Sequence, residues 1–377
     1  MFAPDVYAQR LGRAQQLAAE KGLAGLLVTA GADLAYLTGS WISTHERLTV
    51  LAIPAQGTPT LVLPAVDRGD LAKSAIPQLN INVSGWEDGD APHRTALAAL
   101  NIGASKNPSE TAIGVAASMT ADHLLTFMDI QPASYQLATY VLKELFTRKD
   151  QAEIEQLRGA GAAIDRVHAQ VPGLIKAGRS EKEVAADLEQ LILQEHSAVD
   201  FIIVGSQENG ANPHHDFSDR VLEPGDVVVV DIGGTFGPGY HSDCTRTYQV
   251  AGAEPDAETV QFYRVLREAQ EKAVQAVRPG VKAADIDALC RTAITDAGYG
   301  EAFIHRTGHG IGLSTHEEPF IMAGNDLVLE PGMAFSIEPG IYLEGRVGAR
   351  IEDIVVVTET GCERLNNQPR DLVVGEK

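Results

Sequence analysis

The chain has 377 residues, of which 44% are hydrophobic, and its 51 acidic and 30 basic side chains give a net charge of −21. This length favours two domains, and the excess of acid argues against nucleic acid or an anionic membrane as a partner. The first residues lack the basic segment and apolar core of a signal peptide, and the three cysteines lack metal-type or disulfide spacing. We therefore expect a cytoplasmic protein without a membrane span.

The first part of the chain alternates between helical and extended patterns. Apolar spacing predicts a helix over Asp5–Lys21. Short apolar runs predict strands at Gly22–Ala30, Leu48–Pro54, Thr58–Pro64 and Thr111–Val115, before an interruption at residues 132–134. Helices alternating with strands are typical of an α/β unit. We therefore expect an N-terminal α/β domain over residues 1–145.

The second part, residues 146–377, shows the same order of elements twice. Asp150 with Glu153 and Ser180 with Glu183 have the spacing of helix N-caps and predict two helices, the second ending near Glu195. A strand group follows. Two further helices are predicted at Asp256–Val277 and Ala283–Ala297, and a second strand group comes after them. This order indicates an α+β domain built by internal duplication.

The duplication is visible in the letters themselves. L-E-P-G-D-V-V-V-V-D-I-G (Leu222–Gly233) and L-E-P-G-M-A-F-S-I-E-P-G (Leu329–Gly340) share Leu-Glu-Pro-Gly, an acid and a final glycine at an offset of 107 residues. Two halves related by a pseudo-twofold axis would bring Asp231 and Glu338 to one point. The alternative is that Leu-Glu-Pro-Gly is an ordinary turn before a strand and that the acids face solvent.

Each half carries a second acid on the returning strand of a hairpin. These are Asp243 and Glu352, at an offset of 109 residues, so the second hairpin is slightly longer. Facing side chains on adjacent strands lie about 5 Å apart at Cβ, and four carboxylates so close would repel one another without a cation among them. Two divalent ions bridged by carboxylates satisfy such a site, and they polarise a carbonyl and lower the pKa of a shared water.

Histidines accompany both strand groups. His305, His309 and His316 fall within the stretch H-R-T-G-H-G-I-G-L-S-T-H, just before the Glu338 strand. Its glycines disfavour a helix, so we predict an extended segment whose backbone passes close to the metals. His214 lies in N-P-H-H-D, upstream of the Asp231 strand, where the proline favours a loop or strand edge.

Four motifs together carry a specific resemblance. D-I-G-G-x-x-G-x-G-Y-x-S-D-x-T-R-T, G-H-G-I-G-L-x-x-H-E, S-I-E-P-G-I-Y and R-I-E-D resemble the pita-bread metallopeptidases, which include Xaa-Pro dipeptidase (prolidase), aminopeptidase P and methionine aminopeptidase. A-D-L-A-Y-L-T-G (Ala32–Gly39) resembles the N-terminal domain of the proline-specific and creatinase members. The resemblance implies a creatinase-like N-terminal α/β domain and an α+β pita-bread catalytic domain with a pseudo-twofold duplication.

The resemblance also implies roles for single residues. The implied metal ligands are Asp231, Asp243, His309, Glu338 and Glu352. Asp243 and Glu352 would bridge the two ions, with Asp231 completing one and His309 with Glu338 the other. Glu338 would also serve as general base and then acid, with His214 and His316 stabilising the tetrahedral intermediate. His305 matches a histidine of the substrate-pocket wall.

Two further expectations concern residues near the metal ligands and the identity of the ions. Arg350 shares strand parity with Glu352 and is expected at the substrate site or behind a bridging carboxylate. Tyr240, on the Asp243 hairpin, is as readily explained by packing. Oxygen ligands with a single nitrogen favour Mn²⁺, with Co²⁺ or Zn²⁺ as alternatives.

The chain departs from the family pattern at two places. Asp231 and Asp243 are twelve residues apart, one more than is usual, and the turn T-F-G-P-G-Y is expected to absorb the extra residue. Many microbial prolidases carry an arginine after H-E-x-P that is thought to grip the dipeptide carboxylate. Here Phe320 follows Pro319, which leaves aminopeptidase P open beside dipeptidase.

The resulting hypothesis is an exopeptidase with two divalent ions that cleaves Xaa-Pro bonds of short peptides, as a homodimer in the cytoplasm. Methionine aminopeptidase is a rival that the N-terminal domain disfavours. The alternatives from other classes are a metal-free, creatinase-like amidinohydrolase and a peptidase-shaped binding protein without catalysis. The five intact ligand positions speak against both.

Overall fold

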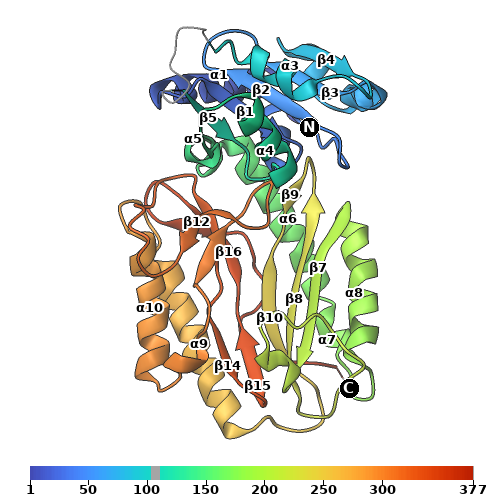
Figure 1. Ribbon diagram of the computed structural model, residues 1–377. Helices are drawn as coiled ribbons and strands as arrows, with labels where there is room; N and C mark the ends of the chain where they lie inside the picture. The colour runs from blue at the N-terminus through green and yellow to red at the C-terminus, as the bar shows by residue number, and fades with distance from the viewer. Residues whose placement is uncertain (103–110, 377) are drawn as a thin grey trace. The chain divides into compact units, whose positions relative to one another are not determined.

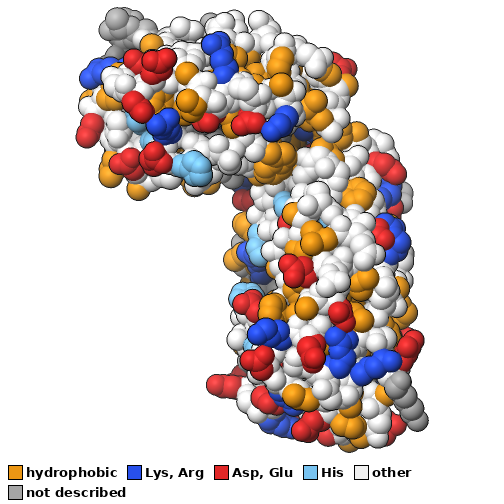
Figure 2. Space-filling view, turned by 90° about the vertical axis from the view of Figure 1, so that its right-hand side faces the viewer, with side chains coloured by type: hydrophobic (Ala, Val, Ile, Leu, Met, Phe, Trp, Pro, Cys, Tyr) orange, Lys and Arg blue, Asp and Glu red, His pale blue; other side chains and the backbone are white. Residues whose placement is uncertain are grey.

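The computed structural model describes residues 1–102 and 111–376. It divides into two compact units, Met1–Phe146 and Thr147–Lys377. Within the described residues, every helix is too short or too polar to cross a membrane. On the face drawn in Figure 2, acidic and basic side chains are interspersed and form no continuous basic surface.

The first unit is built on a six-stranded mixed sheet with the order β4-β3-β2-β1-β5-β6 (Figure 1). β1 pairs with β2 antiparallel and with β5 parallel, and all five of its residues are buried. Leu97 of α3 and Phe127 of α4 pack against the sheet in the core. The elements are α1 (Pro4–Glu20), β1 (Gly25–Thr29), α2 (Ala32–Thr38), β2 (Val50–Pro54), β3 (Thr60–Pro64), β4 (Asn82–Trp86), α3 (Pro92–Ala99), β5 (Ala112–Val115), α4 (Ala121–Ile130), β6 (Ser134–Leu137) and α5 (Thr139–Phe146).

The predicted helix and four predicted strands of this unit are confirmed as α1, β1, β2, β3 and β5. The predicted interruption at residues 132–134 is wrong in part, because Ser134 already begins β6, which pairs parallel with β5. β4 and β6 were not predicted because they are edge strands with partly exposed side chains, so the apolar run that marks a buried strand is absent.

The first half of the second unit places two helices over one sheet. Both predicted capping boxes are confirmed, because Asp150 and Ser180 each accept a hydrogen bond from the backbone of the glutamate three residues later. Ile164 of α6 and Leu188 of α8 pack against Val230 of β8 in a shared core. The elements are α6 (Gln151–His168), α7 (Val171–Leu174), α8 (Glu181–Glu195), β7 (Ala198–Ser206), β8 (Val227–Phe236), β9 (Tyr240–His241) and β10 (Cys244–Gln249).

The second half repeats this arrangement. Leu266 of α9 and Ile286 of α10 pack against Phe335 of β13 in a second core. The sheet has the order β12-β11-β13-β16-β17, with β14 and β15 as a separate pair. The elements are α9 (Ala257–Ala276), α10 (Ala283–Asp296), β11 (Gly308–Gly310), β12 (Glu317–Ile321), β13 (Ala334–Ile337), β14 (Gly340–Leu343), β15 (Val347–Arg350), β16 (Asp353–Val357), β17 (Cys362–Arg364) and β18 (Val373–Val374), which pairs with β10.

The two halves meet along their strands. Figure 1 shows α8 outside one sheet and α9 with α10 outside the other, and β10 contacts β15 and β16 between them. A helix pair with a sheet therefore occurs twice, as the sequence repeat predicts.

The strand registers differ at the predicted acids. In the first half Asp231 pairs with Thr245. In the second half Ile337 pairs with Asp353, so the next step along brings Glu338 opposite Glu352. The expectation that Asp243 faces Asp231 in the same way is wrong, because Asp243 lies two positions before the paired Thr245. The turn that is expected to absorb the extra residue lies between β8 and β9, where Gly237 and Gly239 have positive φ angles of 56° and 114° that favour glycine.

Candidate metal centre

The five predicted ligands come from both halves and converge. Asp231 lies in β8 and His309 in β11, whereas Glu338, Asp243 and Glu352 flank strand ends. Ligand atoms lie within 4.8 Å of one another in each of three groups. These groups are Asp231–Asp243–Glu352, His309–Glu338–Glu352 and Asp243–His309–His316. Glu352 belongs to both the first and the second group, so it links the two halves of the cluster.

The cluster is buried, and some of its oxygens have no partner. Asp231, Asp243 and Glu352 are 8%, 4% and 1% exposed. Oδ1 of Asp231 and Oε1 of Glu352 are buried, and no group among the described residues donates a hydrogen bond to either oxygen. Burying a carboxylate oxygen without a donor costs several kcal/mol, so this arrangement calls for a cation. Four carboxylates and one imidazole at such distances are a donor set that fits divalent metal ions.

The charges of the cluster shift the pKa values of its members. Burial, together with the negative charge of Asp231, raises the pKa of Asp243 well above its usual value. Burial and the charge of Asp243 likewise raise the pKa of Glu352. Both shifts have the same two physical causes: burial, which disfavours the charged form, and more negative charge in the site than its own side chains neutralise.

His309 and Glu338 form an ion pair inside the cluster. Burial alone would lower the pKa of His309, but the hydrogen bond and the charge of Glu338 raise it to about 9. His309 Nε2 lies 3.2 Å from Oε1 of Glu338 and 3.6 Å from Oδ2 of Asp243. Nδ1 of His309 donates to the carbonyl of Gly310 at 3.1 Å. The ring is therefore held with Nε2 toward the carboxylates, which is the orientation that a metal-ligating imidazole needs.

The segment that carries His309 is extended, as predicted, and its glycines are required by close strand packing. A Cβ at Gly308 would clash with the carbonyl oxygen of Ser336, and one at Gly310 with that of Glu318. These glycines thus allow β11 to fit between its neighbours β13 and β12. The expected close approach of this backbone to the metals stays a prediction.

Arg350 lies behind Asp231. Its Nη2 donates to Oδ2 of Asp231 at 2.6 Å, and its Nε donates to Thr245 Oγ1 at 3.0 Å. Thr245 in turn donates to Oε2 of Glu352 at 2.9 Å. Arg350 thus touches Asp231 directly and Glu352 only through Thr245. Its Nη1 donates to Tyr342 Oη at 2.7 Å, so its donors are directed at protein groups.

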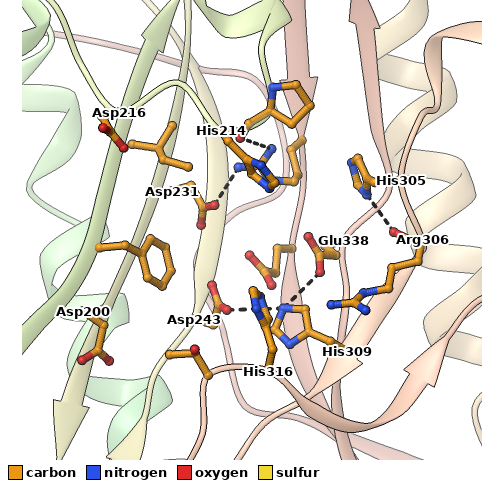
Figure 3. Close-up of a pocket in the computed structure, with 16 residues that line it drawn as sticks. Asp200, His214, Asp216, Asp231, Asp243, His305, Arg306, His309, His316 and Glu338 are labelled. Carbon is orange, nitrogen blue, oxygen red and sulfur yellow. Dashed lines mark hydrogen bonds and ion pairs between the residues drawn. The ribbon is translucent and has the colours of Figure 1, made fainter. Parts of the chain in front are cut away.

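The remaining predicted histidines line the same cavity, with different environments. The rings of His316 and His309 are 4.0 Å apart, and burial with the charge of His309 lowers the pKa of His316 to about 4. His305 Nδ1 donates to the carbonyl of Arg306, and its Nε2 is 3.0 Å from Tyr342 Oη. His214 lies in an exposed turn, and its ring faces the cavity (Figure 3).

The loop that presents His214 is anchored by a buried carboxylate that sequence reasoning missed. Glu181, fully buried at the start of α8, accepts hydrogen bonds from backbone and hydroxyl of both Ser206 and Ser218 at 2.6–2.9 Å. His215 Nε2 lies 2.9 Å from the same carboxylate. Glu181 therefore holds both ends of the loop, and it also holds His215, the residue that follows His214. In the sequence it looks like a first-turn helix acid.

The cavity in front of the cluster has a volume of about 710 Å³, which is enough for a small peptide. Several lining residues were not predicted: Asp200, Phe201, Ile203, Pro213, Asp216, Arg306 and Thr315. Only Arg306 had a sequence signal, its place in the H-R-T-G-H stretch. Tyr240 is absent from the lining. It is fully buried and donates to Glu153 Oε1 at 2.8 Å, which agrees with the packing interpretation.

Comparison with known proteins identifies the family. Residues 155–359, the part that holds the cluster, match metallopeptidase family M24. The chain belongs to this family. Residues 10–158 of this M24 peptidase match the creatinase/prolidase N-terminal domain. Its fold is therefore a creatinase-type N-terminal domain followed by a pita-bread catalytic domain.

The similarity to individual proteins extends over the whole chain. The probable dipeptidase PepE of Mycobacterium tuberculosis is 54% identical over 99% of this M24 peptidase and 98% of its own length. An Xaa-Pro dipeptidase of Lactobacillus helveticus is 36% identical over 90% of this chain and 92% of its own. The crystal structure of dipeptidase PepE from Mycobacterium ulcerans superposes with a TM-score of 0.94 at 53% identity and covers 99% of both chains.

Proposed function

We propose that this M24 peptidase uses two divalent metal ions to hydrolyse Xaa-Pro bonds at the ends of short peptides. The observation that carries the proposal is the convergence of four carboxylates and one imidazole, with buried oxygens of Asp231 and Glu352 left without a donor. The relatives named dipeptidase and Xaa-Pro dipeptidase support the substrate class.

In this proposal Asp231, Asp243 and Glu352 hold one ion, and His309, Glu338, Asp243 and Glu352 hold the other. When bound, the two ions polarise the scissile carbonyl and lower the pKa of a water. Glu338 is the natural proton carrier, because its side chain is 16% exposed and borders the cavity. Ser336 Oγ donates to Oε1 of Glu338 at 2.9 Å and fixes the direction of that carboxylate.

The histidines would act on the substrate. His316 has a pKa of about 4, so it is neutral at pH 7 and offers one N–H to the carbonyl oxygen that gains charge in the transition state. His214, on the anchored loop, would contribute a second hydrogen bond. His305, hydrogen-bonded to Tyr342 Oη, would form part of the pocket wall.

Three finer points belong to the same proposal. Mn²⁺ is favoured by a set of carboxylate oxygens with one nitrogen, and Co²⁺ and Zn²⁺ are its competitors. The three free cysteines favour a reducing compartment such as the cytoplasm. A homodimer is proposed from family resemblance alone, and sedimentation would test it.

Metal removal tests the main proposal. Protein stripped with a chelator should lose hydrolysis of Ala-Pro and Ala-Pro-Ala, and Mn²⁺ or Co²⁺ should restore it. Activity that persists in chelator would favour the metal-free amidinohydrolase. Inactivity with every metal would favour a binding protein.

A further inference from the structure

One side of the cavity is formed by strand β7 and by the loop that follows it. Four side chains from these two segments line the cavity and form what we call the β7 wall: Asp200, Phe201, Ile203 and Asp216. Figure 3 shows Asp200 and Asp216 on one side of Asp231 and Arg306 on the other side. The β7 wall therefore combines two apolar side chains with two acids.

The apolar part of the β7 wall begins beside the metal cluster. β7 and β8 pair antiparallel, with Ile203 opposite Asp231 and Phe201 opposite Gly233. Side chains that face each other on neighbouring strands lie on the same face of the sheet, so Ile203 and Phe201 share the face of Asp231. A Cβ at Gly233 would lie 2.5 Å from Cε1 of Phe201, so the glycine leaves room for this ring. A substrate side chain directed from the cluster toward β7 would lie along these two apolar groups.

Asp216 lies beyond β7, at the far end of the wall. The backbone N–H of Val204 donates to the carbonyl of Asp216 at 2.7 Å, so the loop runs along the edge of β7 that is not paired with β8. Two strand spacings, roughly 10 Å in all, therefore separate the backbone of Asp231 from that of Asp216. An extended lysine side chain spans about 6 Å from Cα to Nζ, which leaves room for the side chain of Asp216 to meet it.

The two acids of the β7 wall differ in how their charge is used. Asp200 accepts a hydrogen bond from Thr235 Oγ1 at 2.7 Å, and its Oδ2 lies 2.6 Å from Nδ1 of His241. Among residues 1–102 and 111–376, no group donates a hydrogen bond to the carboxylate of Asp216 or forms an ion pair with it. The wall thus ends in a carboxylate that remains available to a positively charged ligand group.

We propose that the β7 wall binds the side chain of the first substrate residue, and that Asp216 makes this chain favour peptides that begin with lysine or arginine. This inference rests on the proposed function. The carbon stem of such a side chain would lie against Ile203 and Phe201, and its charged group would pair with Asp216. The α-amino group does not reach Asp216, because it is attached to the carbon next to the scissile carbonyl and stays beside the metal cluster.

Dipeptides with matched first residues test the proposal. Lysine and norleucine have the same four-carbon stem, and only lysine carries a charge. With Mn²⁺, kcat/KM of the wild type should be about three- to tenfold higher for Lys-Pro than for norleucine-Pro, between the values for an exposed ion pair and for a charge-assisted hydrogen bond. Asp216→Asn should bring this ratio to about 1, because the charge is lost. Asp216→Lys should reverse the preference, so that Glu-Pro is cleaved faster than Lys-Pro.

The control is a second acid of the same connection between β7 and β8. Asp219 is exposed, lies 3.7 Å from Nζ of Lys182 and is outside the set of residues that line the cavity. Asp219→Asn should therefore keep the wild-type ratio. In about 1 M NaCl the preference of the wild type for Lys-Pro should shrink, because salt screens a partly exposed ion pair. The ratio of two substrates within one protein is independent of the fraction of that protein that is active.

The outcomes separate this role from others. A wild type that cleaves Lys-Pro and norleucine-Pro equally well, or an Asp216→Asn protein that keeps the preference, would overturn the proposal. Equal losses on both substrates in Asp216→Asn would also overturn it, because they would place the carboxylate at the α-amino group that both substrates share. A wild type that cleaves no Xaa-Pro dipeptide with any metal would instead overturn the proposed function, and with it this assignment.

Discussion

Arg350 donates a hydrogen bond from Nη2 to Oδ2 of Asp231 at 2.6 Å, while Oδ1 of the same carboxylate has no donor. One oxygen is thus held by the protein and the other is aimed into the cluster. A carboxylate fixed in this way loses little rotational freedom when it binds an ion, because its rotamer is already set.

Replacing Arg350 should therefore weaken metal binding. We expect Arg350→Met to lower Mn²⁺ affinity about 10- to 100-fold, the range for partners that orient ligands. Calorimetric titration of stripped protein measures this directly. Arg267→Met is a control, because Arg267 forms its ion pair with Asp371 at an exposed position. Unchanged affinity in Arg350→Met would show that Asp231 needs no orientation.

Removing one charge from the cluster should have opposite effects on the stability of the metal-free and the metal-bound protein. Glu352→Gln removes a buried carboxyl whose pKa is raised by burial and by the negative charges of Asp243, Glu338 and Asp231, so the metal-free protein should gain about 1–3 kcal/mol in free energy of unfolding. With Mn²⁺ present the order should reverse, because the variant has lost a ligand shared by both groups of the cluster. Thermal unfolding with and without chelator shows both effects, and a variant less stable than wild type in chelator would contradict the account.

Loosening the Glu181 anchor should affect substrate contact more than metal binding. In Glu181→Gln an amide N–H₂ would face groups that now donate to a carboxylate oxygen, so we expect a loss of about 1–3 kcal/mol in stability. KM for Ala-Pro should rise because the loop with His214 is less ordered, while Mn²⁺ affinity should stay within about twofold of the wild type. Glu189→Gln, at an exposed position of the same helix, is the matched control. A large loss of Mn²⁺ affinity in Glu181→Gln would contradict this division of roles.

His168 should make stability depend on pH. Burial, aided by the charge of Arg246, lowers the pKa of His168 to about 3, and its ring lies between Tyr248 Oη and the carbonyl of Cys244. In the unfolded chain a histidine titrates near pH 6.5, so below that pH the unfolded state binds the extra proton and stability falls as pH falls toward 3. Between pH 7 and pH 5 this single group costs about 2 kcal/mol.

Urea unfolding followed by circular dichroism in chelator checks this value. In His168→Gln the fall in unfolding free energy from pH 7 to pH 5 should be about 2 kcal/mol smaller than in the wild type. His45→Gln, at an exposed position, should keep the wild-type fall. An equal fall in all three proteins would show that His168 is already protonated in the folded state.

The cluster was predictable because the repeat places acids at the same step of two similar strands. Asp231 and Glu338 follow from that repeat without any knowledge of distances. The strand pairing did not follow, because the register depends on which hairpin residues are taken up by the turn between β8 and β9. The contact of Arg306 with the ring of Phe320 was not predicted, because only the pairing of β11 with β12 brings the two side chains close. Glu181 was missed because a buried acid and an exposed first-turn acid look identical in sequence.

The pairing of Asp231 with Thr245 has a consequence for how such a chain can change. If the first half repeated the second half strictly, a glutamate would stand at position 245, opposite Asp231 and next to Glu352. The hydroxyl of Thr245 now donates a hydrogen bond to Glu352 at this place. A further negative charge there would repel Glu352 and remove the hydroxyl that donates a hydrogen bond to it. The two halves are therefore complementary rather than interchangeable. The first half supplies the hydroxyl of Thr245, which donates the hydrogen bond, and the second half supplies Glu352, which accepts it. Two copies of the same half would lack this hydrogen bond.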